Sequence, residues 1–129
     1  MSTRSHIGMI ERDGSIKVVY CHSDGYLEFT GKRLLDNHNS VPLARKLIDI
    51  GNMSFVGSAM IDADIAMRYK FLCVYFADIK KHFTDIEYFY LYAVDKSIFN
   101  KVGWWVSKDG QKWDMVKNEL LNVKMMVLV

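Results

Sequence analysis

Apolar and polar residues alternate in two short runs near the N-terminus, and this pattern predicts a β-hairpin. The runs cover residues 5–11 and 15–21 and flank an Arg-Asp-Gly turn at 12–14. Asp-Gly between two alternating runs is the strongest short signal for a hairpin turn. After Lys17 the second run is apolar on both faces, so we expect a central strand there rather than an edge strand.

Helical spacing follows the hairpin in two segments. The first, 27–38, carries three leucines on one side. Gly31 weakens its middle by about 1 kcal/mol relative to Ala, so we expect the helix to begin near Thr30. The second segment has Ser40 as its expected N-cap and ends at Gly51, because glycine suits the left-handed backbone that follows many helices.

The second half of the chain contains further strand patterns. Residues 69–76 and 86–94 are apolar on both faces, which indicates buried strands. The run 103–115 holds a second Asp-Gly pair between alternating residues and predicts a second hairpin. We expect a helical turn or two at 116–122. The apolar end of the chain, 123–129, is expected to add a strand to the sheet or to dock on a partner.

This order of elements predicts the fold class. Two strands, two helices, four further strands and a short closing helix indicate an α+β protein, in which a mainly antiparallel sheet built from hairpins carries two or three short helices on one face. The chain has 129 residues and no linker or low-complexity segment. We therefore expect a single domain over residues 1–129.

The charge of the chain gives little indication that the protein binds nucleic acid. The formal net charge is +2, and charged residues make up 25% of the chain. The two basic clusters, 31–33 and 80–82, are short, so each is expected to be a solvated face rather than a phosphate contact. Nucleic acid is not excluded as a partner, but no concentrated basic surface points to it.

Cysteine usage and hydropathy point to a cytoplasmic protein. Cys21 and Cys73 both lie in apolar runs and are expected to be buried, reduced thiols. The N-terminus is polar through His6, so we expect no signal peptide. No apolar run reaches the roughly 18 residues of a membrane span, so we expect no membrane partner.

Sequence motifs of common metal and cofactor enzymes are missing. The histidines lack HExxH spacing, neither cysteine belongs to a CxxC pair, and no glycine-rich phosphate loop occurs. We therefore expect no metal and no cofactor. The common nucleotide-hydrolysing and dinucleotide-dependent enzymes are disfavoured.

The polar turn after the second run contains the most side chains that could bind a ligand or take part in a reaction. His22, Asp24 and Tyr26 stand close together at a strand end, where binding groups are often displayed on a rigid support. His22 and Asp24 can serve as a catalytic base and the group that orients it. The alternative is ordinary turn chemistry, in which Asp24 accepts backbone hydrogen bonds. No nucleophile can be assigned, because Ser23 and Cys21 are each explained equally well as ordinary structural residues of the turn and the strand.

Two cations are expected near this turn. The hairpin should set Arg4 beside His22 and Asp24, where its planar fork of donors can grip an anion. The alternative for Arg4 is an ion pair with Asp24 or Glu28. Lys32 is expected in the first turn of a helix, where free backbone N–H groups attract anions. We expect Arg4, His22, Asp24 and Lys32 to form the functional surface.

Aromatic residues offer a second candidate surface. Trp104 and Trp105 are adjacent on a predicted strand and should point to opposite faces. One of them is then expected in the core and the other in contact with solvent, and Trp105 is a candidate for partner contact. An exposed tryptophan beside the tyrosine stripe at 88–92 can stack on a nucleobase. The alternative is that the stripe is simply one face of the core.

Several short motifs of the chain are shared with one protein family. They are T-R-S at 3–5, D-G at 13–14, Y-C-H-x-D-G-Y at 20–26, G-K-x-L-L at 31–35, Y-F-Y at 88–90 and W-W-V at 104–106. On these motifs the chain resembles a family of small uncharacterised proteins associated with bacteriophages, prophages and gut bacteria. Ser23 stands where the family pattern has Trp, and Leu27 stands where it has Pro.

The resemblance implies a phage or prophage setting and no particular reaction. By analogy with other small phage accessory proteins, we expect a non-enzymatic protein that binds and inactivates a host component, in host takeover or anti-defence. Its partner would be a host protein or a nucleotide-type ligand in the cytoplasm of the infected or lysogenic cell. The alternative is a small hydrolase or nuclease that uses His22 and Asp24. The apolar C-terminal end also predicts a possible homodimer.

Overall fold

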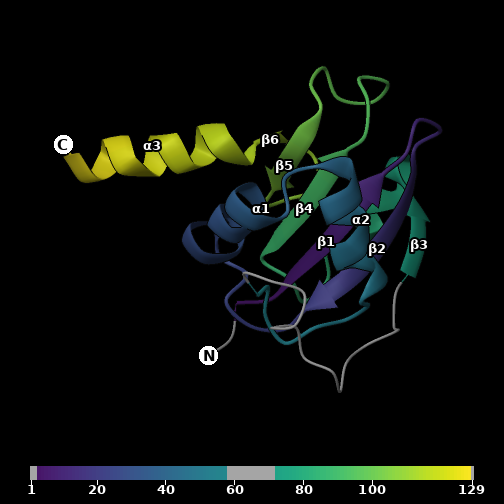
Figure 1. Ribbon diagram of the computed structural model, residues 1–129, viewed down its shortest axis with the longest axis horizontal. Coiled ribbons are helices and arrows are strands. Elements are labelled where there is room, and N and C mark those ends of the chain that lie inside the picture. Colours follow the sequence, from purple (N-terminus) through teal and green to yellow (C-terminus); the bar gives the residue numbers. More distant parts are fainter. Residues whose placement is uncertain (1–2, 58–71, 129) are drawn as a thin grey trace.

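The computed structural model describes residues 3–57 and 72–128 and shows an α+β fold (Figure 1). A single sheet of six strands carries the three α-helices on one face and a short 3₁₀-helix on the other. The elements in chain order are β1 (Ser5–Ile10), β2 (Ser15–Cys21), η1 (Leu27–Gly31), α1 (Lys32–Asn37), α2 (Val41–Asp49), β3 (Leu72–Tyr75), η4 (Phe76–His82), β4 (Tyr88–Ala93), β5 (Gly103–Ser107), β6 (Asp114–Met115) and α3 (Val116–Leu128).

The strands are arranged in the order β3-β2-β1-β4-β5-β6. Both predicted Asp-Gly hairpins are present, as the antiparallel pairs β1–β2 and β5–β6. The predicted central position of β2 is also confirmed, because it pairs with β1 on one side and β3 on the other. The sheet is mainly antiparallel, but β1 and β4 at its centre are parallel.

Each face of the sheet is covered by its own layer. The three α-helices pack on one face through residues such as Leu34, Leu47 and Val116. This confirms the prediction of helices on one face, and Figure 1 shows α1 and α2 lying across the sheet. The opposite face is covered by the 3₁₀-helix η4, through Ile79, and by aromatic side chains including Phe99. A sheet buried on both sides explains why its central strands are apolar on both faces.

The helical run after the first hairpin begins earlier than expected. It starts at Leu27 with the short π-helix η1 and continues into α1, so the expected start near Thr30 is wrong. Gly31 lies inside this run with ordinary helical backbone angles. A Cβ on Gly31 would lie 3.0 Å from Leu27 Cδ1 and 3.1 Å from Val116 Cγ1. Close packing against α3 therefore accounts for this glycine.

Two features of β3 differ from the sequence prediction. Within the described ranges β3 pairs only with β2, so it is an edge strand and not the expected buried strand. Leu72 and Tyr75 are 46% and 59% exposed, and Cys73 is also exposed, whereas Cys21 is buried as expected. The predicted strand residues 69–71 lie outside the described residues. An apolar pattern on both faces does not by itself guarantee that a strand has two neighbours.

The C-terminal segment is helical and not a strand. α3 continues from Val116 to Leu128, so the strand that was one of the two expectations for 123–129 is wrong. Residue 129 lies outside the described residues, and the other expectation, docking on a partner, stays a prediction. Val116, Leu120 and Val123 recur at helical spacing on the core side. The leucines and methionines of this segment are strong helix formers. Among the described residues, no helix is both long and apolar enough to cross a bilayer.

Candidate functional site

Arg4 directly precedes β1 and His22 directly follows β2, so both lie at the same end of the sheet, near Tyr20. The His22 ring Nδ1 is 2.8 Å from the Tyr20 hydroxyl. The backbone N–H of Arg4 donates to Glu87 Oε2 at 2.6 Å, and the Arg4 carbonyl accepts from the Glu87 N–H at 2.9 Å. Burial raises the pKa of Tyr20, while the nearby positive charge of Arg4 acts to lower it. The hairpin thus brings these two predicted residues together.

Asp24 and Tyr26 belong to a tight turn packed on the start of β1. Asp24 has a positive φ of 56°, which Asp adopts more readily than most residues. Its carbonyl accepts from the Thr30 hydroxyl at 2.6 Å. The next residue, Gly25, donates its N–H to the Thr3 carbonyl at 2.8 Å. The Tyr26 ring lies 6.0 Å from that of Phe29. This geometry favours a role for Asp24 as an ordinary turn residue over a role as the group that orients His22.

Lys32 faces a different part of the molecule. Its ammonium group pairs with Asp36 at 2.8 Å on the same helix. With Lys117 and Lys124 it lines a groove of about 280 Å³ between α1 and α3. In the described part of the chain, no hydrogen bond or salt bridge joins Lys32 to Arg4 or His22. The structure thus places Arg4 and His22 at one end of the sheet and Lys32 in the groove between α1 and α3.

The expectation that one tryptophan is exposed is wrong. Trp104 is 1% exposed and Trp105 is 8% exposed, because both faces of the sheet are covered. The Trp105 ring stacks on Phe99 with centroids 4.6 Å apart, and its Nε1 donates to the Lys101 carbonyl at 3.0 Å. Trp105 is thus a core residue, and its ring faces are not available for stacking on a ligand.

The thiol of Cys21, next to His22 in the sequence, is not suited to act as a nucleophile. Burial raises the pKa of Cys21 to about 11. At neutral pH this thiol is protonated, and the thiolate is the reactive form. Its Sγ lies 3.5 Å from the Ser23 carbonyl, to which it donates. Cys21 therefore acts as a buried structural thiol.

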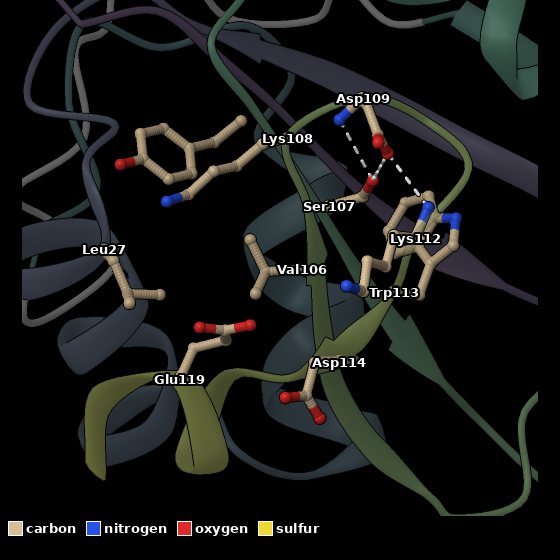
Figure 2. Close-up of a pocket in the computed structure, with 10 residues that line it drawn as sticks. Leu27, Val106, Ser107, Lys108, Asp109, Lys112, Trp113, Asp114 and Glu119 are labelled. Atoms are coloured by element: carbon tan, nitrogen blue, oxygen red, sulfur yellow. Dashed lines mark hydrogen bonds between the residues drawn. The ribbon is translucent and has the colours of Figure 1, made fainter. Parts of the chain in front are cut away.

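A pocket that the sequence did not indicate lies at the edge of the sheet where β5 ends (Figure 2). It encloses about 340 Å³, within the usual range of roughly 300–1,000 Å³ for small-ligand sites. β4, β5, the β5–β6 hairpin, η1 and the start of α3 all contribute to it. The lining residues are Leu27, Tyr88, Val106, Ser107, Lys108, Asp109, Lys112, Trp113, Asp114 and Glu119.

Two carboxylates of the pocket are already bonded within the protein. Asp109 Oδ1 accepts from the backbone N–H groups of Gln111 at 2.8 Å and Lys112 at 2.9 Å. The hydrogen bonds from Lys112 and then Gln111 lower the pKa of Asp109. Asp114 Oδ1 accepts from the Met115 N–H at 2.8 Å. These two acids shape the hairpin and the start of α3.

Aromatic side chains form two walls of the pocket. The Tyr88 ring stacks on Tyr90 with centroids 6.0 Å apart and planes inclined by 14°. The Lys108 ammonium lies 5.7 Å from the Tyr88 centroid. Trp113 packs against the aromatic side chains on the sheet face opposite the α-helices, where its ring lies 5.6 Å from that of Phe99. Both walls are therefore fixed by the fold.

Comparison with family models, with curated proteins and with solved structures gives no match to this chain. Among the described residues, no three His, Cys, Asp or Glu side chains gather in a way that can hold a metal ion. The pocket geometry is therefore the main guide to function.

Proposed function

We propose that this chain is a non-enzymatic phage-type accessory protein that binds and inactivates a host component, by sequestering a small host molecule in the pocket beside β5. The phage setting rests on the motif resemblance. The observation that supports binding is the pocket itself, with two fixed aromatic walls and charged side chains at its centre. Such a combination is typical of ligand sites, in which a few polar groups orient a ligand against apolar walls.

The contacts of the polar residues favour binding over hydrolysis. The Ser107 hydroxyl lies within the hairpin turn, where it accepts from the Gly110 N–H at 2.8 Å. His22 contacts Tyr20 at another place on the molecule, and Asp24 belongs to a turn. A hydrolase needs a base within hydrogen-bonding reach of a nucleophile or water at the ligand. The pocket lining contains neither histidine nor cysteine.

The test is ligand capture from a bacterial small-molecule extract by the immobilised full-length protein, followed by mass spectrometry of the eluate. We expect wild type to retain a compound and to return it chemically unchanged. Lys108→Ala combined with Lys112→Ala should lose that compound. The matched control is Lys96→Ala with Lys101→Ala, which removes two exposed lysines outside the pocket lining and should retain it.

Two outcomes would contradict this proposal. If the wild type captures nothing above the double lysine variant, the pocket is not the binding site. If the captured compound is converted to a product and His22→Ala stops the conversion, the hydrolase alternative is correct.

A further inference from the structure

A second hollow of the molecule is the groove of about 280 Å³ between α1 and α3. Figure 1 shows α3 passing α1 and extending beyond the body of the protein. Leu35 of α1 and Leu120 of α3 line the groove and pack against the core, so the fold holds these two side chains in place. Among the described residues, the groove and the pocket beside β5 share no lining side chain. A partner in the groove is therefore independent of a ligand in that pocket.

The charged side chains of the groove are mostly positive. Among its described lining residues, Asp36 is the one acid beside Lys32, Lys117 and Lys124. Lys32 pairs with Asp36 at 2.8 Å, whereas Lys117 and Lys124 are exposed and form no salt bridge with a described residue. The acid of α3, Glu119, lines the pocket beside β5 instead. Two ammonium groups at the groove thus lack an opposite charge among the described residues.

Exposed apolar side chains accompany these two lysines. Leu121 lines the same groove and is 58% exposed, and Met125, one turn further along α3, is 57% exposed. Residues three and four apart are neighbours on a helix, so Lys117, Leu121 and Lys124 share one side of α3. Apolar surface bordered by charged groups is typical of interaction sites. A groove with such a lining is the kind of surface on which proteins receive an amphipathic helix.

We infer that the groove between α1 and α3 binds an acidic amphipathic helix of a partner protein. The apolar side of that helix lies on Leu35 and Leu121, and its Asp or Glu side chains lie against Lys117 and Lys124. Carboxylates accept hydrogen bonds from ammonium groups, and such charge-assisted bonds are stronger than neutral ones. This site goes beyond the proposed function, because it takes a protein and not a small molecule.

Two other occupants fit the groove less well. A nucleic-acid backbone can neutralise the lysines, but its charged phosphates offer no apolar surface to cover Leu121. A second copy of this chain brings its own lysines to the groove, where like charges would meet. The expected homodimer is better suited to the outer side of α3, around Met125. Because Leu121 borders both surfaces, a second copy and the acidic helix would compete.

The first measurement is fluorescence anisotropy of the full-length protein with labelled synthetic peptides of about four helical turns. One peptide carries leucines along one side and glutamates beside them, and the matched peptide carries lysines in place of the glutamates. We expect the acidic peptide to bind at least about tenfold more tightly, because the basic peptide replaces two attractions by two repulsions. Equal affinities, or no binding of either peptide below about 1 mM, would overturn the inference.

The second measurement reverses the charge of the groove. Lys117→Glu with Lys124→Glu should bind the basic peptide about tenfold more tightly than the acidic one. Both lysines are exposed, so this variant should keep the circular dichroism spectrum of wild type. Lys96→Glu with Lys101→Glu makes the same change of charge at exposed positions outside the groove lining and should keep the preference of wild type. A reversed preference in this control would show that net charge governs binding and would overturn the assignment to the groove.

The third measurement tests the apolar contact and separates a protein partner from a lipid surface. Leu121→Ala should weaken binding of the acidic peptide about fivefold, because less apolar surface is then buried. Wild type should sediment with phosphatidylglycerol vesicles no more than Lys117→Glu with Lys124→Glu does. Stronger sedimentation of wild type, together with an unchanged peptide affinity of Leu121→Ala, would assign the two lysines to an anionic membrane surface and overturn the inference.

Discussion

The hydroxyl of Tyr90 ties the central strand β4 to the polar turn that follows β2. It donates to the Gly25 carbonyl at 2.7 Å, and Tyr90 itself is 0% exposed. The Gly25 N–H is bonded to Thr3. A Cβ on Gly25 would lie 2.8 Å from the Thr3 carbonyl oxygen, so only glycine fits the turn there. The bond from Tyr90 and the bond to Thr3 together hold Gly25 in place within the His22–Tyr26 turn.

Tyr90→Phe should therefore destabilise the protein. The substitution leaves the Gly25 carbonyl without its partner in the interior, which costs about 1–3 kcal/mol of the free energy of unfolding. The measurement is urea denaturation followed by circular dichroism. The control is Tyr92→Phe, since the Tyr92 hydroxyl makes no hydrogen bond to described residues and its removal should change stability by less than about 0.5 kcal/mol. Equal stability of both variants would refute this role for Tyr90.

His6 provides a residue-level source of pH dependence. Its ring lies edge-on to Phe89, with centroids 5.2 Å apart, and its buried Nδ1 has no partner among the described residues. Burial, and then the positive charge of His82, lower the pKa of His6 to about 4. The usual value in an unfolded chain is about 6.5. Between these values the unfolded chain holds a proton that the folded protein does not.

The free energy of unfolding should therefore fall as the pH is lowered from about 6.5 to about 4, by at most about 3 kcal/mol from His6 alone. Burial lowers the pKa of His38 too, so its contribution has the same sign. His6→Phe suits the aromatic surroundings and removes the titrating group. We expect this variant to lose less stability than wild type over that pH interval in urea titrations. Parallel pH profiles for the two proteins would contradict the assignment.

The start of α2 shows a local signal that determines structure by itself. The Ser40 side chain accepts from the Leu43 N–H at 3.2 Å, as the predicted N-cap should. Gly51 follows the helix with a φ of 92°, which a residue with a side chain rarely adopts. Both features could be predicted because the residues that make them are neighbours in sequence.

Ser40→Ala should lower the free energy of unfolding by about 1 kcal/mol, because a backbone N–H of the first turn loses its acceptor. Ser40→Asp should keep most of the stability, since aspartate caps helices equally well. Thermal melts of both variants provide the measurement. Asn39→Ala, at the exposed neighbouring position, is the control. A melting temperature of Ser40→Ala equal to that of the control would show that the cap is not needed.

Elements whose pairing depends on distant parts of the chain were predicted less well. The sequence patterns located β1, β2, β4 and β5, but they did not reveal that β1 and β4 are parallel neighbours. The exposed face of β3 and the length of α3 were also missed. Strand order and exposure depend on which segments meet in space, and alternation within one segment does not contain that information.

The pocket is a property of the whole molecule, and this is why no motif indicated it. The sequence pattern predicts Tyr88 as part of an aromatic stripe and Lys108 as part of a hairpin turn. Only the parallel pairing of β4 with β1 and the return of α3 onto η1 bring Tyr88, Leu27 and Glu119 together. The one available signal was the Lys-Asp-Gly turn at 108–110, which places a lysine beside a strand end.

The expected homodimer stays a prediction, and α3 offers the surface that would form it. Val116, Leu120 and Val123 contact the core, whereas Leu121 and Met125 are 58% and 57% exposed on the outer side. Figure 1 shows the later turns of α3 extending beyond the body of the protein. A helical segment gains most of its stability from packing of its apolar side. A second copy that pairs its own α3 with this one would bury both outer surfaces by the same contacts.

Light scattering of the full-length chain should therefore give twice the monomer mass. Leu121→Lys with Met125→Lys should give the monomer mass, because the twofold contact would then place four added charges together. Asn39→Lys with Asn100→Lys adds the same charge at exposed positions away from α3 and should stay dimeric. A monomeric wild type over a broad concentration range would exclude the dimer. Dissociation of the control variant as well would mean that net charge, and not the α3 surface, governs association.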